Sequence, residues 1–280
     1  MNTILLGESQ TMEIVKTTGF GVYLSLPDGD GEEVLLPRKQ VPADAKEGDS
    51  IRVFIYKDSE DRIIATTMEP LITLGKTAKL TVKQTTKIGA FLDWGLAKDL
   101  LLPFKEQIYP VREGEQVLVA LYIDKSERLC ATMHVYDYLT TDNPYSVDDT
   151  VDGTLYEIIE NFGAFVAVDD KYSAMIPMKE FTEDVAPGSA VTARVTGVRE
   201  DGKLSLCLHQ KAYVQMDADS RMIYDKLTAA GGFLPYHDKS APDDIKREFH
   251  LSKNAFKRAI GRLYKEKRIR IAEDGITLIS

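Results

Sequence analysis

The sequence predicts three small all-β barrels in tandem, followed by a small α+β domain of the winged-helix type. Two observations lead to this prediction. A unit of about 65 residues, made of short strand-like segments, occurs three times before residue 210. After residue 213 the pattern changes to helical periodicity, and the composition becomes basic.

The bulk composition of the 280 residues is that of a globular protein, with 44% hydrophobic and 28% charged residues. No apolar run reaches the roughly 18 residues of a membrane span, and the start MNTILLGESQTMEIVK lacks the basic and apolar regions of a secretory signal. Cys130 and Cys207 lie far apart without a CxxC motif, which favours two reduced structural thiols. We therefore expect a cytoplasmic protein with no membrane segment.

Charge is distributed unevenly along the chain. Residues 1–210 carry 21 Lys and Arg against 34 Asp and Glu, a net charge of −13, whereas residues 211–280 carry 14 against 10, a net charge of +4. Residues 245–271 contain ten basic residues and only two acidic ones. A basic end on an acidic chain indicates a polyanion as partner of that end.

The three repeated segments share four landmarks: a glycine, a proline, a second glycine and a basic residue. The first gap is 16, 14 and 14 residues in the three copies, the second is 11 in all of them, and the third is 14, 14 and 15. Offsets kept three times indicate a true repeat. The landmarks are Gly21, Pro37, Gly48 and Arg62 in the first copy, Gly89, Pro103, Gly114 and Arg128 in the second, and Gly163, Pro177, Gly188 and Lys203 in the third.

Each copy reads as about five short strands. IRVFIY, VLVALYI and VTARVTGV are rich in β-branched and aromatic residues and precede turn clusters such as KDSED, DKSER and REDG. Five strands in so small an all-β unit suit the OB-fold, whose closure removes exposed sheet edges. The predicted domains are 1–67, 70–135 and 146–210 for the barrels, the last copy matching the pattern best, and 214–280 for the C-terminal domain.

Aromatic side chains around the first glycine give the functional hint. Rings spaced along a strand of an OB face let successive bases stack. The competing explanation is that these rings belong to the barrel cores. The second copy has Ile88 where the others have an aromatic ring, which predicts a weaker platform there. The candidates are Phe20, Tyr23, Phe91, Phe162 and Phe165.

The copies resemble the RNA-binding OB domain of ribosomal protein S-one in the FGAFV segment, the proline segment, the G-x-x-V strand and the basic last strand. The resemblance implies RNA contacts by the aromatics above and by an Asp/Arg pair near the final strands. The pair falls on Asp58 and Arg62 in copy one and on Asp124 and Arg128 in copy two, whereas copy three has Arg199 and Lys203. The histidine that the S-one pattern carries is proline in all three copies: Pro37, Pro103 and Pro177.

The last domain reads as three helices and a hairpin. Ile223, Leu227 and Ala230 recur at helical spacing before Gly231-Gly232. Ser240-Ala-Pro-Asp243 resembles a capped start of a second helix, with Ile245 and Phe249 facing inward. Ser252 is the predicted cap of a third helix with an apolar stripe of Phe256, Ile260, Leu263 and Tyr264, and residues 268–272 and 276–279 alternate about a turn as a hairpin does.

This order of elements predicts a winged helix, in which the third helix grips nucleic acid. Its basic side chains would neutralise phosphates, and Asn254 at the helix start would reach a base edge. The competing explanations are a solvated charged face or a protein-docking wing. The candidates are Lys253, Asn254, Lys257, Arg258, Arg262, Lys265, Lys267 and Arg268.

Three S-one-type units followed by DDIKREFxLSKxAFKRAIGRLYKE closely resemble the bacterial conserved virulence factor B family. This resemblance implies a cytoplasmic RNA-binding regulator of the expression of other genes. We find no nucleophile elbow, HExxH motif or metal-ligand spacing, so we expect no catalysis and no cofactor.

The sequence therefore favours an RNA-binding protein that grips single-stranded RNA by the barrel aromatics and the basic winged helix. Two alternatives stay open: a regulator that binds duplex DNA through the winged helix, and a protein scaffold associated with the ribosome or RNA polymerase. The RNA target and the oligomeric state do not follow from the sequence.

Overall fold

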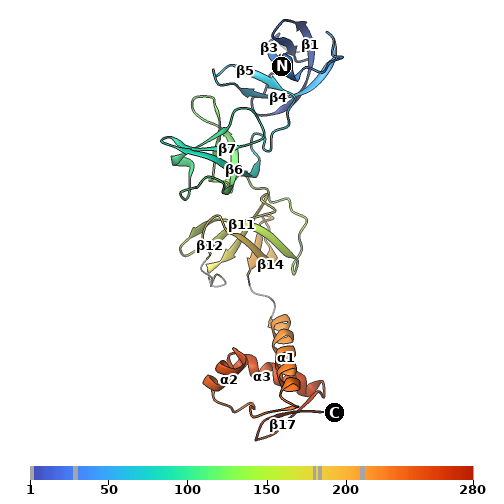
Figure 1. Cartoon of the computed structure of the whole chain (residues 1–280), viewed down its shortest axis with the longest axis vertical. Helices are drawn as coiled ribbons and strands as arrows, with labels where there is room; N and C mark the ends of the chain where they lie inside the picture. Colours follow the sequence, from blue (N-terminus) through green and yellow to red (C-terminus); the bar gives the residue numbers. More distant parts are fainter. Residues whose placement is uncertain (1–2, 28–30, 179–180, 182–184, 209–211, 280) are drawn as a thin grey trace. The chain divides into compact units, whose positions relative to one another are not determined.

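The computed structural model describes residues 3–27, 31–178, 181, 185–208 and 212–279. The chain divides into two compact units, Met1–Leu208 and His209–Ser280. The first unit contains the three strand-rich copies and the second contains the three labelled α-helices (Figure 1).

The three copies of the first unit share one strand order. In copies one and three the first strand pairs with the second and fourth, and the third pairs in parallel with the fifth, so that the five strands close into a barrel. This is the OB-fold order and confirms the predicted fold class. Copy one comprises β1 (Ser9–Thr17), β2 (Gly21–Ser25), β3 (Glu33–Pro37), β4 (Ser50–Lys57) and β5 (Ile63–Thr66), with the 3-10 helix η1 (Arg38–Gln40). Copy three comprises β11 (Thr150–Ile159), β12 (Gly163–Val168), β13 (Tyr172–Pro177), β14 (Ala190–Val198) and β15 (Leu204–Cys207).

The second copy is nearly closed. Its sheet runs β10-β9-β6-β7-β8, and the edge strands β8 and β10 pack side by side without a continuous ladder. Its elements are β6 (Thr77–Thr86), β7 (Gly89–Asp93), β8 (Leu100–Pro103), η2 (Phe104–Glu106), β9 (Gln116–Ile123) and β10 (Leu129–Thr132). A further 3-10 helix, η3 (Tyr136–Tyr138), lies in the segment that leads to copy three.

The repeated glycine and proline landmarks face each other across two neighbouring strands. Gly163 pairs with Pro177, and the same register joins the equivalent residues of the other copies. Gly163 has φ +151°, and a Cβ there would lie 2.2 Å from the carbonyl oxygen of Ile176. The close approach of the paired strand leaves no space for a side chain, which explains why glycine stands at this offset in every copy.

Each barrel buries its own apolar core, and ring contacts join neighbouring barrels. Trp94 of copy two is 2% exposed and meets Phe54 and Tyr56 of copy one edge-on, at ring-centroid distances of 5.8 and 6.3 Å. Val135 and Tyr156 belong to a buried cluster that joins copies two and three. Neighbouring barrels therefore pack against each other through buried side chains.

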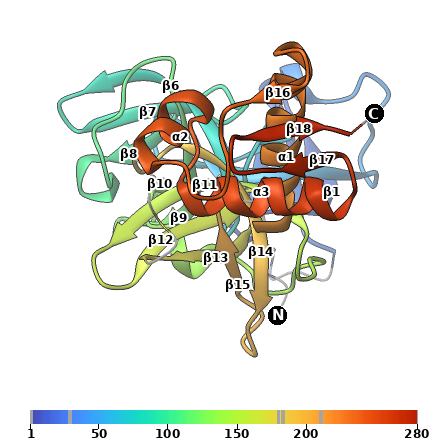
Figure 2. The same cartoon turned by 90° about the horizontal axis from the view of Figure 1, so that it is seen from below.

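The second unit is a winged helix, as predicted. Its elements are α1 (Ala212–Ala229), β16 (Phe233–Leu234), α2 (Pro242–Phe249), α3 (Lys253–Lys265), β17 (Ile269–Ile271) and β18 (Ile276–Leu278). The two strands of the wing pair as an antiparallel hairpin, and β16 adds a third strand to it. In Figure 2, α3 crosses in front of α1, with the hairpin beside it.

Of the predicted helix details, one cap is confirmed, and a second cap and one edge of the apolar stripe change. Ser252 caps α3 as predicted, its hydroxyl accepting from the backbone N–H of Ala255 at 3.2 Å. The predicted cap Ser240 is wrong: α2 begins after Ala241, and the Ser240 hydroxyl accepts from the N–H of His237 instead. Tyr264 is 57% exposed, and Ala259 is buried instead. The buried face of α3 therefore includes the side of Phe256 and Ile260 on which Ala259 lies, and excludes the side of Tyr264.

Ala230 also lies outside the core. It is exposed and follows the end of α1, where Gly231 and Gly232 turn the chain with positive φ. Across the described segments, no helix combines the length and the apolarity that crossing a bilayer requires.

Candidate nucleic-acid interface

The third barrel brings its four predicted contact residues together around one hollow. Phe162 lies in the turn before β12 and is 67% exposed, whereas Phe165 on β12 is half-buried. Arg199 and Lys203 lie at the two ends of the β14–β15 turn and line the same hollow of about 270 Å³. An exposed ring beside two cations is the arrangement that binds a base and its phosphate.

The two cations of this hollow are held by a carboxylate between them. Asp201 lies 3.5 Å from the Arg199 guanidinium and 3.3 Å from the Lys203 ammonium. Hydrogen bonds from Lys203 to the Tyr136 hydroxyl, at 3.1 Å, and to Asp201 raise the pKa of Lys203 above its usual range. Lys203 is therefore charged at neutral pH and fixed in position.

The hollow contains a further aromatic residue that the sequence analysis missed. Tyr136 of η3 lies outside the repeated unit, yet its ring meets Phe165 edge-on at a centroid distance of 5.9 Å. The Lys203 ammonium lies 5.3 Å from the centre of the Tyr136 ring. A residue before the repeat carries no spacing signal, so the repeat could not point to it.

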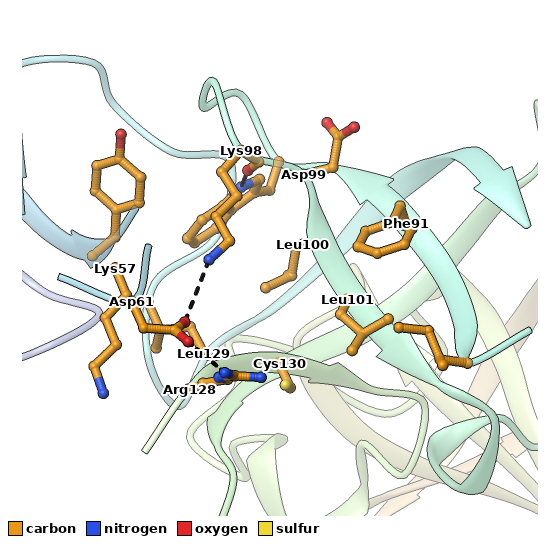
Figure 3. A pocket seen from close by; sticks show the side chains of 13 residues that line it. Lys57, Asp61, Phe91, Lys98, Asp99, Leu100, Leu101, Arg128, Leu129 and Cys130 are labelled. Atoms are coloured by element: carbon orange, nitrogen blue, oxygen red, sulfur yellow. Dashed lines mark hydrogen bonds and ion pairs between the residues drawn. The ribbon is translucent and has the colours of Figure 1, made fainter. Parts of the chain in front are cut away.

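The second barrel also has a pocket on its face, of about 200 Å³. Its predicted contacts Phe91 and Arg128 both line it, together with the exposed Ile88. Asp61 of the first barrel reaches over the rim, where dashed lines in Figure 3 mark its ion pairs with Lys98 and Arg128. The cation predicted to bind phosphate is thus paired with a carboxylate of the neighbouring barrel.

The predicted contacts of the first barrel are more dispersed. Phe20 is 82% exposed, and Tyr23 is half-buried with the Lys16 ammonium 5.9 Å from its ring centre. Arg62 is held in its own turn by Asp58 at 2.7 Å and by Glu60 at 3.1 Å. Across the three barrels, every predicted arginine or lysine contact is paired with an acidic side chain.

The winged helix presents its polar candidates on the side of α3 that faces away from the core. Phe256, Ala259 and Ile260 are buried, whereas Asn254, Lys257, Arg258, Lys265 and Lys267 are exposed and Lys253 is half-exposed. Positions 254, 258 and 265 follow one line along the helix, since they are four and seven residues apart. This line is the candidate contact surface of the second unit.

Two candidates of the second unit are engaged within it. Arg262 is ion-paired with Glu266 at 2.8 Å and is only 22% exposed. Arg268 lies 3.5 Å from the other carboxylate oxygen of Glu266, with its guanidinium 5.5 Å from the ring centre of Tyr224. Both arginines are paired with Glu266 at the end of α3, and Arg268 also contacts α1, so they are poorer phosphate contacts than the cations of this line that are unpaired among the described residues.

Comparisons with known proteins agree with this architecture. A family model of the S1 domain, the S-one type, matches residues 6–68 and 74–134. A model of the CvfB-like winged helix domain matches residues 221–278. Tandem barrels of this type joined to a winged helix define the class of the protein: it is a nucleic-acid-binding protein.

Relatives over nearly the whole chain narrow the class to a family. A Bacillus subtilis protein, YitL, is 33% identical over 94% of this chain and 90% of its own. Conserved virulence factor B of Staphylococcus epidermidis is 32% identical, covering 98% and 95% of the two chains. The chain belongs to the conserved virulence factor B family. A crystal structure of a Streptococcus pneumoniae multidomain protein with nucleic acid binding domains is 26% identical, with 98% of each chain covered and a TM-score of 0.49.

Proposed function

We propose that the protein binds single-stranded RNA in the cytoplasm and regulates gene expression at the RNA level, by binding and without catalysis. The observation that carries the proposal is the hollow of the third barrel, where Phe162 is two-thirds exposed beside Arg199 and Lys203. The exposed ring offers a flat apolar face on which a base can stack, and the two cations beside it can meet the phosphate of the same nucleotide.

Single strands fit this surface better than duplexes. Stacking on a side chain requires a base whose face is free, and bases in a duplex are already stacked on each other. Sequence preference does not follow from the rings, because every base has a face that can stack. We therefore expect unstructured RNA to compete better than an RNA hairpin with a long stem.

The test compares Phe162→Ala and the Phe162→Ala/Phe165→Ala pair with the unaltered chain in titrations of labelled single-stranded RNA at stated salt. Each lost stack should weaken binding by about 1–3 kcal/mol. Val147→Ala is the control, since Val147 is an exposed apolar residue of the same barrel outside the hollow. Unchanged affinity in a folded double variant would refute the stacking role.

Phe165 needs a separate control for folding. Its ring packs against Tyr136 and lies 6.2 Å from the ring of Tyr156, which is 4% exposed. Phe165→Ala should therefore lower stability as well as binding, whereas Phe162→Ala should lower binding alone. Circular dichroism of each variant separates the two effects.

A second candidate function rests on the exposed line of α3. Asn254, Arg258 and Lys265 would fit a duplex groove if this helix binds DNA as other winged helices do. Duplex DNA is therefore included as a competitor in the same titrations. Preference for duplex DNA would favour a DNA-binding regulator, and binding to neither nucleic acid would favour a scaffold at the ribosome or RNA polymerase.

A further inference from the structure

Tyr136 belongs to the segment between barrels two and three, and its neighbours hold it firmly. Val135 is fully buried in the cluster that contains Leu118 of barrel two and Tyr156 of barrel three. The N–H of Tyr138 donates to the carbonyl of Val135 at 2.9 Å, closing the turn of η3. The backbone on both sides of Tyr136 is thus anchored, and its side chain has a defined position.

The Tyr136 side chain is not itself part of that core. It is 43% exposed and lines the hollow of barrel three together with Phe162 and Phe165. A tyrosine that served only to anchor the segment would bury its ring among the residues that bury Val135. Instead its hydroxyl accepts a hydrogen bond from Lys203, a cation of the hollow.

The size and lining of the hollow suit one nucleobase. Its volume of about 270 Å³ falls below the roughly 300–1,000 Å³ of sites for drug-sized ligands. Aromatic rings line it, and Arg199 and Lys203 lie at its rim, where the phosphate attached to a bound base would pass. Flat apolar walls and a cationic rim match a base and its backbone, and match neither a metal ion nor a purely apolar ligand.

We propose that Tyr136 is the third aromatic wall of a pocket in barrel three that receives a single base of single-stranded RNA. The proposal rests on the proposed function and adds a residue from outside the barrel to its site. Tyr136 supplies a ring for the base, and its hydroxyl holds the Lys203 ammonium where the phosphate passes. Binding by barrel three then depends on the segment before it, residues 135–139, as well as on the barrel.

The test uses full-length variants and a short oligouridylate as probe. Tyr136→Leu keeps apolar volume but removes the ring, and should weaken binding by about 5- to 150-fold, the range found for the loss of one stacked base. Tyr136→Phe keeps the ring and loses only the hydrogen bond to Lys203, so it should lose less affinity than Tyr136→Leu. Phe162→Ala is measured in parallel because it tests the proposed function without touching residue 136.

The outcomes separate the two proposals. If Phe162→Ala weakens binding and Tyr136→Leu does not, the base pocket has no third wall, and the inference is overturned while the proposed function stands. If neither variant weakens binding, the hollow is not the RNA site, and both are overturned. Losses in both variants, with Tyr136→Phe closer to the unaltered chain, support the inference.

A second measurement avoids substitutions, in case Tyr136→Leu fails to fold. The unaltered protein is irradiated with an oligouridylate containing 4-thiouridine, and the cross-linked residues are identified by mass spectrometry. We expect cross-links at Tyr136 as well as at Phe162. Cross-links at Phe162 without any in the peptide that carries Tyr136 would overturn the inference.

Discussion

The guanidinium of Arg128 in the second barrel is ion-paired with the carboxylate of Asp61 in the first. Lys98 lies 3.9 Å from the same carboxylate and donates a hydrogen bond to the Asp58 carbonyl at 2.7 Å. The β4–β5 turn of one barrel therefore neutralises the cations at the rim of the next barrel's pocket (Figure 3). A phosphate that binds there has to replace a carboxylate.

Asp61→Asn should raise the affinity for single-stranded RNA, because it frees Arg128 for a phosphate. An exposed pair of this kind contributes at most about 1 kcal/mol, so the gain should be a few-fold. The slope of log affinity against log salt should steepen by about 0.7, the value for one added single-strand contact. Asp44→Asn removes the same charge from an exposed site on the same barrel and serves as control. Equal effects of the two variants would show that Arg128 does not contact RNA.

Replacement by alanine should change stability in opposite directions at two glycines. A Cβ at Gly163 would lie 2.2 Å from a backbone oxygen, so Gly163→Ala should destabilise the first unit by at least about 1–3 kcal/mol. Gly261 lies within α3, and a Cβ there would meet nothing within 4 Å, so Gly261→Ala should stabilise the second unit by about 0.5–1 kcal/mol. Hydrogen exchange followed by mass spectrometry reports on each unit separately. If both variants stabilised their units, or both destabilised them, this explanation would be wrong.

The barrel fold could be predicted because its constraints are local and repeat. The glycine that pairs with Pro177 must lack a side chain, and the same constraint recurs at Gly21 and Gly89, which pair with the equivalent prolines of their copies. Likewise, the wing follows from alternation about a turn at Gly275. Patterns of this kind depend on neighbours in the sequence or on the adjacent strand, so they are visible in a single amino-acid sequence.

The rest of the site depends on contacts between modules. Asp61 reaches Arg128 of the next barrel, and Tyr136 reaches Lys203 from the preceding segment. Such contacts depend on how two folded pieces meet, and the offsets repeated within each copy do not record them. The wrong prediction that Tyr264 is buried has a related cause. Helical spacing puts Tyr264 at the edge of the apolar stripe of α3, and the elements that pack on α3 determine which edge of the stripe is buried.

Cys130 should be unreactive in the folded protein. It is 2% exposed, and burial together with the nearby Asp124 carboxylate raises the pKa of its thiol to about 11. At pH 8 its thiolate fraction is then about 200-fold below that of an ordinary cysteine, whose pKa is about 8.5. Alkylation of Cys130 by iodoacetamide, followed by mass spectrometry, should be slower by at least this factor in the native protein than in urea.

The same shift implies a dependence of stability on pH. The folded thiol keeps its proton up to about pH 11, whereas the unfolded thiol ionises near pH 8.5. The contribution of Cys130 to stability is therefore complete below about pH 8.5 and falls as the pH rises toward 11. Cys130→Ser should flatten this alkaline decline, and prompt labelling of the native thiol at pH 8 would contradict the burial argument.

The two units should contribute differently to the salt dependence of RNA binding. The first unit lies within the acidic residues 1–210, with a net charge of −13, and its predicted cations are paired with carboxylates. The second unit lies within the basic remainder, with a net charge of +4, and α3 exposes cations away from its core. Phosphate neutralisation should therefore come mainly from the winged helix, and stacking, which depends less on salt, from the barrels.

Neutralising the exposed cations of α3 tests this division. The sequence alone groups Arg258 and Lys265 with Arg262, but Arg262 is engaged with Glu266, so Lys257 takes its place in the test. Replacing Lys257, Arg258 and Lys265 by Gln should flatten the slope of log affinity against log salt by about two, at roughly 0.7 for each single-strand phosphate contact. The matched control replaces Arg221, Lys239 and Lys246 by Gln, which removes the same charge from exposed positions of the same unit outside α3. If the α3 variant keeps the slope of the unaltered chain, or changes it no more than the control does, this helix does not contact RNA phosphates, and a protein partner becomes the better explanation of its basic surface.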